Sequence, residues 1–445
     1  MRTLPLIAAA LALAALAAPA AAAAPPPVLM ISIDGLRPTD VTDAPARGLK
    51  IPALRAILAN GAWASGVRNM LPTVTYPNHT TLITGAAPAL HGITSNVAFD
   101  PLQKNQDGWY WYARDIKVAT LWDAVHKSGR RTASIGWPVS VGTPFVDLDI
   151  PEYWRARTPD DVKLVNALAT PGLVDELSRV ANTDAAGLQN TEPQNDDAKS
   201  NFAIALLTLK RPSFMTLHLS SLDHYEHLYG PGSAEANATL ERIDADVGRI
   251  VAAARRAMPD LVVVIVSDHG FAAVEHDVNL MAAFADAGLV TLDPATGKVK
   301  SWDAEPWNAG GSSAIMLARP DDAVLKAKVR ALLDKLAADP SSGIAAVIDR
   351  AQIAAIGGGA EPDFWVDYRI GYEAGAKFAG PLVTPGSNKG MHGYFPSHPE
   401  MRAAFIIDGA AKKGPLGEID MRDIAPTLAK ILEVDLPQAT GKPLF

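Results

Sequence analysis

Six acidic and imidazole side chains of this chain have the types needed to bind metal ions and do hydrolytic chemistry. They are Asp34, Asp223, His227, Asp268, His269 and His392. Carboxylate oxygen combined with imidazole nitrogen, in a chain without cysteine, suits Zn²⁺ or a similar transition metal better than Ca²⁺ or Mg²⁺. Three carboxylates and three imidazoles provide enough ligands for two divalent cations, an arrangement typical of hydrolases.

Short apolar runs at residues 28–33, 214–219 and 261–266 are expected to position five of the six side chains. Each run is typical of a buried strand, and the five residues lie just past the ends of these runs. In open α/β sheets the ligand crevice lies at the carboxyl ends of the strands, so we expect the five to converge there. The sixth, His392, lies between glycines in an expected tight turn.

Taken alone, each of these motifs has an ordinary structural explanation. Asp223 and His227 are four residues apart, which places them on one face of a helix, but such a pair is more often structural. Asp268 and His269 precede Gly270, which allows the backbone to turn sharply after a strand. It is their joint placement near strand ends that favours a metal site.

A second chemical element is the segment Thr75-Tyr76-Pro77-Asn78-His79. Proline is well tolerated in a first helical turn, so a helix is predicted to begin here. Thr75 would then lie at a helix N-terminus, where free backbone N–H groups favour anions, and a metal could activate its hydroxyl as a nucleophile. The alternative is that Thr75 is only a helix N-cap. We interpret His79 as a helix-packing residue.

The composition describes a globular protein with a sizeable core. Hydrophobic residues make up 48% and charged residues 20% of 445 residues, and the net charge of −8 argues against a nucleic-acid scaffold. Residues 1–24, with a basic start and an Ala-rich apolar stretch, predict a cleaved signal peptide; a membrane anchor is the alternative. We therefore expect a periplasmic or secreted protein of a Gram-negative-type bacterium, without a stable membrane anchor.

The chain is predicted to form an α/β fold. Apolar runs alternate with helical patterns from about residue 28 to 257, which indicates a central, mostly parallel sheet flanked by helices. Residues 271–390 have a different sequence pattern, interrupted by turns rich in Gly and Pro, and we interpret them as an inserted α+β cap. Residues 25–445 are accordingly expected to form a single catalytic domain.

Together these motifs resemble the nucleotide pyrophosphatase/phosphodiesterase family of the alkaline phosphatase superfamily, which implies an alkaline-phosphatase-like fold and two zinc ions. The runs that carry the resemblance are Ile33-Asp34-Gly35, Thr75-Tyr76-Pro77-Asn78-His79, Ser267-Asp268-His269-Gly270, Met391-His392-Gly393-Tyr394 and residues 223–231. By this resemblance, the first zinc is held by Asp223, His227 and His392. The second is held by Asp34, Asp268 and His269, with Thr75 coordinating it as the nucleophile that becomes phosphothreonine.

The resemblance also implies substrate contacts. Asn96 matches a residue that helps to hold a phosphoryl oxygen, although a turn role is an equal alternative. Tyr76, where the family more often has Phe, matches an aromatic residue beside the nucleotide base. Tyr153 resembles a second stacking residue, with core packing as its alternative. The bulky polar residues 224–226 differ from the family pattern and leave the substrate open.

The expected function is zinc-dependent hydrolysis of phosphodiester or pyrophosphate bonds in a small-molecule phosphate ester, with a nucleotide favoured. A phosphomonoesterase of the same superfamily is the alternative, and Lys389 is the one cation that sequence places close to a metal ligand. A non-catalytic protein that binds nucleotides or headgroups is less favoured, because no ligand or nucleophile of the family pattern is missing.

Overall fold

The structure is a computed structural model that describes residues 24–105, 108–153, 162–188 and 193–445. The predicted signal peptide falls almost entirely on residues 1–23, outside the described residues, and stays a prediction. In the part of the chain that is described, no helix combines the length and the apolar character needed to cross a membrane.

An eight-stranded sheet forms the main body, with strand β1 (Val28–Ile33) near its centre. β1 pairs in parallel with β6 (Phe214–Leu219) on one side and with β7 (Val262–Val266) on the other. The remaining strands are β4 (Thr132–Ile135), β5 (Leu148–Ile150), β18 (Phe405–Asp408), β2 (Ala62–Trp63) and β19 (Gly414–Pro415). Only β18 runs antiparallel to its neighbours β7 and β2, so the predicted mostly parallel sheet is confirmed.

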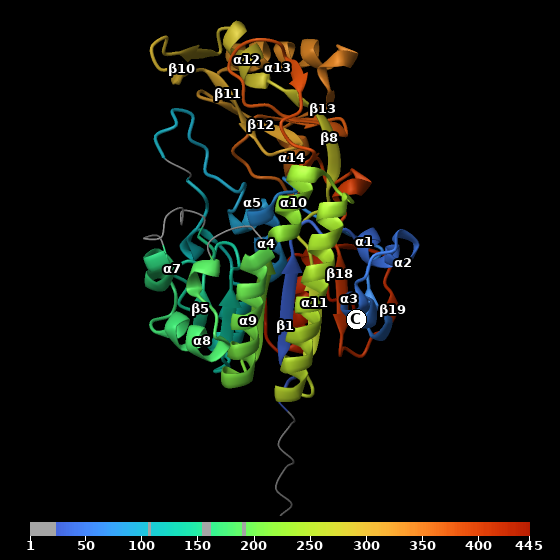
Figure 1. Ribbon diagram of the computed structural model, residues 1–445. Coiled ribbons are helices and arrows are strands. Elements are labelled where there is room, and N and C mark those ends of the chain that lie inside the picture. The colour runs from blue at the N-terminus through green and yellow to red at the C-terminus, as the bar shows by residue number, and fades with distance from the viewer. Residues whose placement is uncertain (1–23, 106–107, 154–161, 189–192) are drawn as a thin grey trace, which may run out of the picture.

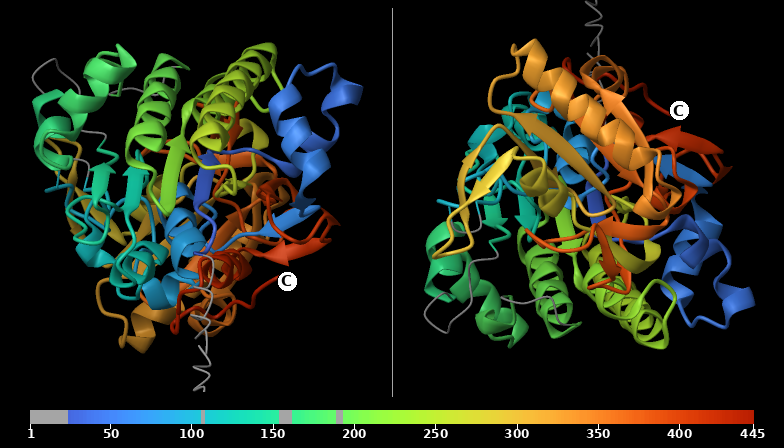
Figure 2. Two further views of the ribbon diagram at one scale, coloured as in Figure 1. Left: turned by 90° about the horizontal axis from the view of Figure 1, so that it is seen from below. Right: turned by 90° about the horizontal axis from the view of Figure 1, so that it is seen from above.

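Helices cover both faces of this sheet because its central strands are apolar on both sides. Leu29, Ile31 and Ile33 of β1 pack against helices on one face. Val28 and Met30 point to the helices of the other face. The first face is covered by α3 (Pro52–Asn60), α9 (Pro193–Lys210) and α11 (Ala234–Ala257), and the second by α4 (Thr75–Thr84), α6 (Leu121–Lys127) and α15 (Ile424–Ile431). Figure 2 shows these two helical layers on either side of the sheet.

A smaller layer lies above the carboxyl ends of the parallel strands (Figure 1). It contains an antiparallel sheet in the order β11 (Ala304–Asn308), β12 (Ser312–Leu317), β14 (Phe364–Tyr368) and β13 (Ile344–Asp349). Helices α12 (Leu280–Asp286) and α13 (Ala323–Ala337) share an apolar cluster with this sheet. The bounds of the predicted cap, about 271–390, and the single-domain assignment for 25–445 stay predictions.

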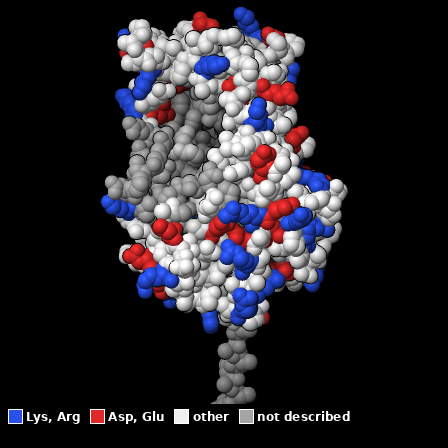
Figure 3. All heavy atoms as spheres, viewed as in Figure 1, with Lys and Arg blue, Asp and Glu red and all other residues white. Residues whose placement is uncertain are grey.

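Strand β8 (Ala272–Val278) connects the main sheet to this smaller layer. It pairs with β15 (Gly371–Ala374), β16 (Val383–Pro385) and the short β17 (Gly390–Met391). The chain therefore returns beside the end of β7 just before His392. On the face shown in Figure 3, the described Lys and Arg side chains lie among Asp and Glu rather than in a basic stripe.

Candidate metal centre

The ends of three adjacent parallel strands deliver five of the six metal-ligand candidates. Asp34 directly follows β1. Helix α10 (Ser221–Tyr229) begins two residues after β6 and carries Asp223 and His227 one turn apart. Asp268 and His269 follow β7, and His392 follows β17. The structure brings all six together, because strands that run in parallel end at the same edge of the sheet.

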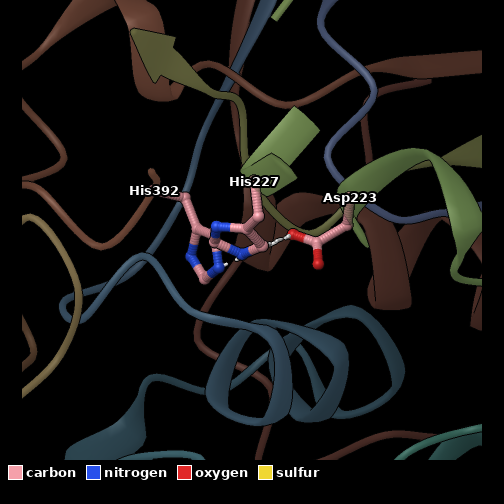
Figure 4. A group of neighbouring side chains, drawn as sticks. All are labelled: Asp223, His227 and His392. Carbon is pink, nitrogen blue, oxygen red and sulfur yellow. Dashed lines mark ion pairs between the residues drawn. The ribbon is translucent and has the colours of Figure 1, made fainter. Parts of the chain in front are cut away.

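The first cluster consists of Asp223, His227 and His392 (Figure 4). The Oδ1 atom of Asp223 lies 3.5 Å from Nε2 of His227 and 3.6 Å from Nε2 of His392. One ligand atom from each residue lies within 4.8 Å of the other two. This is the same triad that the resemblance implies for the first metal.

The second cluster adjoins the first one. Ligand atoms of Asp34, Asp223 and His269 also lie within 4.8 Å of one another. Nε2 of His269 is 3.3 Å from Oδ1 of Asp34 and 3.0 Å from Oδ2 of Asp268. The rings of His269 and His392 stack with centroids 3.6 Å apart. Asp223 therefore belongs to both groups, and the two predicted triads form one continuous site.

Several ligand atoms of the two clusters lack hydrogen-bond partners, as expected where cations bind. Four of the ligand atoms are buried without a hydrogen-bond partner: Asp34 Oδ1, Asp223 Oδ1, Asp268 Oδ2 and His269 Nε2. A buried polar atom that lacks a partner costs about 1–3 kcal/mol, so four at one place call for an unseen partner. A divalent cation satisfies carboxylate oxygens and imidazole nitrogens at once.

The three imidazoles are oriented by backbone carbonyl groups. The pairs are His227 Nδ1 with the Gly390 carbonyl at 3.0 Å, His392 Nδ1 with that of Thr73 at 3.0 Å and His269 Nδ1 with that of Gly270 at 3.2 Å. A carbonyl oxygen only accepts, so each Nδ1–H donates, and Nε2 is the nitrogen of each ring that is left for the cluster. This is the arrangement that metal-binding histidines normally show.

The three buried carboxylates differ in how far neighbouring groups compensate their charge. Burial raises the pKa of Asp34 well above its ordinary value, and the neighbouring charges of Asp268 and Asp223 raise it further. For Asp223, burial has the same sign, but the imidazole of His227 outweighs it and holds the pKa well below the usual range. His269 does the same for the pKa of Asp268. Asp34 is therefore the carboxylate whose buried charge the surrounding groups compensate least.

Thr75 is the first residue of helix α4, as predicted for a helix N-terminus. Its carbonyl accepts a hydrogen bond of 2.9 Å from Nδ1 of His79, a nitrogen that also lies 3.5 Å from Oδ2 of Asp268. His392 bonds to the carbonyl of Thr73, two residues earlier. The segment 73–75 is thus joined to both clusters, and His79 contacts the site as well as packing inside the helix layer.

Asn96 lies against the same helical turn. Its Oδ1 accepts a hydrogen bond of 2.8 Å from the backbone N–H of Tyr76. The Tyr76 ring is fully buried, and its hydroxyl donates to Oε1 of Glu152 at 2.9 Å. Tyr153 belongs to the same aromatic group, with its ring centroid 4.8 Å from that of Trp111. The substrate roles of these three predicted residues stay predictions.

Sequence reasoning missed His218, a fully buried residue of β6. Its Nε2 lies 3.0 Å from Oδ2 of Asp34, and its Nδ1 lies 2.8 Å from Oε2 of Glu152. Burial lowers the pKa of His218, but Glu152 and Asp34 outweigh it and raise the pKa to about 10, which favours the imidazolium form. The available signal was a histidine inside an otherwise apolar central strand.

Other polar residues near the motifs lie outside the cluster of ligand atoms. Glu226 is buried and lies 3.4 Å from the guanidinium of Arg37. Lys389 is exposed, and its backbone N–H donates to the carbonyl of His227 at 2.9 Å. His91 is buried against Thr81.

A family model and several known proteins are similar to this chain. A family model described as type I phosphodiesterase / nucleotide pyrophosphatase matches residues 28–395. Human ectonucleotide pyrophosphatase/phosphodiesterase family member 1 is 28% identical over 254 residues, which cover 55% of this chain and 23% of that protein. The Xenopus laevis bis(5'-adenosyl)-triphosphatase enpp4 is 26% identical over 258 residues, covering 56% of this chain and 48% of the relative. The chain thus spans only part of the length of these relatives.

Solved structures share the fold. Murine ectonucleotide pyrophosphatase/phosphodiesterase 5, in an inactive form in complex with AMP, superposes with a TM-score of 0.66. It is 18% identical, and the match covers 94% of this chain and 97% of that one. The human counterpart gives a TM-score of 0.64 at the same identity and coverage. At this identity the likeness establishes the fold, and it confirms the predicted alkaline-phosphatase-like architecture.

Proposed function

This chain belongs to the type I phosphodiesterase / nucleotide pyrophosphatase family, and from that premise we propose that it hydrolyses phosphodiester or pyrophosphate bonds in small-molecule phosphate esters, nucleotides among them. The observation that carries the proposal is the group of four buried, unpartnered ligand atoms at the edge of the sheet. Segment 73–75, which holds the candidate nucleophile, is hydrogen-bonded to the same site.

We assign two zinc ions to the site. Asp223, His227 and His392 would hold one of them. Asp34, Asp268 and His269, together with the hydroxyl of Thr75, would hold the other. The donor set of nitrogen and oxygen atoms, in a chain without cysteine, supports zinc over Ca²⁺ or Mg²⁺. When bound, the ions supply Lewis acidity, which makes a hydroxyl more acidic and stabilises negative charge on a leaving oxygen.

In the proposed reaction, the chain's own residues bind the ester and transfer its phosphoryl group. The Thr75 oxygen attacks phosphorus, the bond to the leaving oxygen breaks, and a phosphothreonine ester forms. Water then cleaves this ester and restores Thr75. Asn96 would donate from its Nδ2 to a non-bridging phosphoryl oxygen, because its Oδ1 is already held by the Tyr76 N–H.

The test of this assignment is Thr75→Ala assayed on bis-p-nitrophenyl phosphate. We expect turnover to fall by at least about a thousandfold, as for other removed nucleophiles, while the bound zinc stays near the proposed two ions per chain. Thr84→Ala, at the other end of α4, is the matched control and keeps its activity. Unchanged turnover in Thr75→Ala would show that another group attacks phosphorus.

Comparison of mono- and diester substrates tests the phosphomonoesterase alternative. A monoester carries more negative charge and needs an additional cationic contact. The exposed position of Lys389 adds no support for such a contact. We therefore expect faster turnover of the diester, and faster turnover of p-nitrophenyl phosphate would reverse the order of the two candidates.

A further inference from the structure

A cavity of about 640 Å³ lies between strand β11 and the loop that follows Asn96. Three aromatic side chains and a methionine form much of its lining: Phe99, Trp307, Phe378 and Met281. Glu305 also lines it. The walls come from both layers of the molecule, since the loop belongs to the main body and β11 to the smaller sheet (Figure 1).

Two walls of the cavity are linked to segments that lie next to the candidate metal centre. Trp307 packs in one apolar cluster with Val74, the residue directly before Thr75. The opposite wall begins at Val97, which directly follows Asn96. Beyond the end of β11, the Gly311 N–H donates to the carbonyl of His392 at 2.7 Å. The walls of the cavity are thus connected to the metal centre through Val74, Asn96 and Gly311, which makes it a candidate space for the organic part of a phosphate ester.

Glu305 is the unusual residue of this cavity. It lies two positions before Trp307 on β11, so both side chains point to the same face of the sheet. It is only 6% exposed, and its Oε2 is buried without a hydrogen-bond partner. Within the described residues, no ion pair of Glu305 is found either.

Another buried carboxylate on this sheet face, unlike Glu305, has partners for both of its oxygens. Asp367 lies on β14, two residues beyond Trp365, which packs with Trp307. One oxygen of Asp367 accepts the N–H of Phe395 at 3.0 Å, and the other lies 2.7 Å from Nε2 of His398. The fold thus satisfies the structural carboxylate and leaves Glu305 unsatisfied, as expected for a group whose partner is a ligand.

The electrostatic setting of Glu305 agrees with this reading. Burial, with a smaller effect from the neighbouring charge of Asp100, raises the pKa of Glu305 to about 8. A cation next to the carboxylate would offset the cost of ionising it. The rings of Phe99 and Trp307 lie 5.7 Å apart, and aromatic faces attract organic cations.

We propose that this cavity binds an alkylammonium group, with the carboxylate of Glu305 opposite the positive charge and the aromatic side chains against the alkyl carbons. The inference rests on the proposed function where it concerns substrate choice. It assigns to that function a preference for phosphate esters whose organic part carries an amine or a quaternary ammonium.

The test compares choline with its uncharged isostere 3,3-dimethylbutanol in calorimetric titrations of the full chain. The two probes have the same shape and differ in charge, and neither carries phosphate. We expect choline to bind about tenfold more tightly, the size of a carboxylate and cation–π contribution in a partly desolvated site. Equal binding of the two probes by the native protein would overturn the proposal without any variant.

Glu305→Gln, which keeps the size of the side chain, should bring the ratio of the two affinities close to one. Asp303→Asn is the matched control, because Asp303 is a nearby but exposed acid paired with Arg319, and it should keep the preference. Melting curves establish that both variants fold. A preference for choline that persists in Glu305→Gln would place the cation elsewhere.

The outcome for the cavity can be separated from the outcome for the proposed function. If the zinc-loaded protein hydrolyses no phosphate ester but prefers choline, the proposed function fails and the cation site stands. If bis-p-nitrophenyl phosphate is hydrolysed and the two probes bind equally, the hydrolase stands and the cation site fails.

Discussion

The metal centre and the Glu305 cavity both contain buried carboxylate atoms without a hydrogen-bond partner, but the two regions are built differently. At the metal centre, three such carboxylate atoms and the unpartnered Nε2 of His269, all from just beyond the ends of three parallel strands, face one another. In the cavity a single one, Glu305 Oε2, lies on an aromatic face of the smaller sheet. Convergent ligands fit small ions of high charge, whereas one carboxylate among aromatic rings fits a large ion of low charge.

This difference indicates that the two layers have different roles. Parallel strands buried on both faces hold their ends rigidly, which metal ligation and phosphoryl transfer require. The smaller sheet and a loop form the second cavity, and loops tolerate changes that alter recognition without disturbing a core. Four experiments probe this comparison.

Removal of the metal should have the largest effect. Treatment with a chelator is expected to abolish hydrolysis of bis-p-nitrophenyl phosphate and to lower the melting temperature, because ions bound only by the folded state add about 4 kcal/mol at a thousandfold excess over Kd. Zinc should restore both properties. Choline binding in the cavity should survive the treatment, and its loss would mean that the two regions are not separate.

Asp223→Ala should remove more metal than His227→Ala. Asp223 contributes to both clusters, whereas His227 belongs to the first alone. We expect metal analysis to find less than one ion per chain in the first variant and about one in the second, starting from the proposed two. Activity should fall by at least about a thousandfold in both. Equal metal contents would show that Asp223 serves one ion only.

His218→Gln should weaken the binding of one metal ion rather than of both. The substitution removes the charged hydrogen bond to Asp34 but leaves Asp223, His227 and His392 untouched. Loss of such a supporting bond typically costs 10–100-fold in metal affinity, which chelator competition measures. His91→Gln, at an equally buried histidine that contacts Thr81, is the control. Unchanged affinity for both ions would reduce His218 to a packing residue.

Glu305→Gln should change the pH dependence of stability, which is the smallest of the four effects. The folded-state pKa is raised from 4.5 to about 8, so the folded protein binds the proton more tightly than the unfolded chain. Stability of the native protein should therefore fall as pH rises from 4.5 to 8. The variant lacks this loss and should be more stable at pH 8, by about 2 kcal/mol in urea unfolding. If the stabilities of the native protein and the variant changed with pH in parallel, Glu305 would ionise freely.

Much of the fold was predictable because the relevant signals are local. The six-residue apolar runs became β1 and β6, and the Pro77 signal placed the start of α4 at Thr75. The helical pattern that ends near residue 257 is confirmed by α11, which runs from Ala234 to Ala257. The candidate ligands were recognisable because Asp and His recur together near the ends of several such strands.

His218 and Glu305 were not predictable in the same way. His218 lies inside a strand, and only the three-dimensional packing brings Asp34 and Glu152 to its two nitrogens. Glu305 lies on a strand of the smaller layer, where its sequence neighbours do not show that its carboxylate lacks a partner. Both observations depend on contacts between residues far apart in the chain.

The sequence by itself determined which residue types follow the buried strands, and therefore that a metal-dependent hydrolase of this family was the expectation. Continuous apolar runs and strand-end residues depend on neighbouring positions, which a sequence displays directly. Only the tertiary structure decided that Asp223 joins both ligand groups, that a buried imidazolium supports Asp34, and that a carboxylate in an aromatic cavity lies unpaired. Those properties arise from burial and from the absence or presence of a distant partner, and both come into existence only when the layers pack.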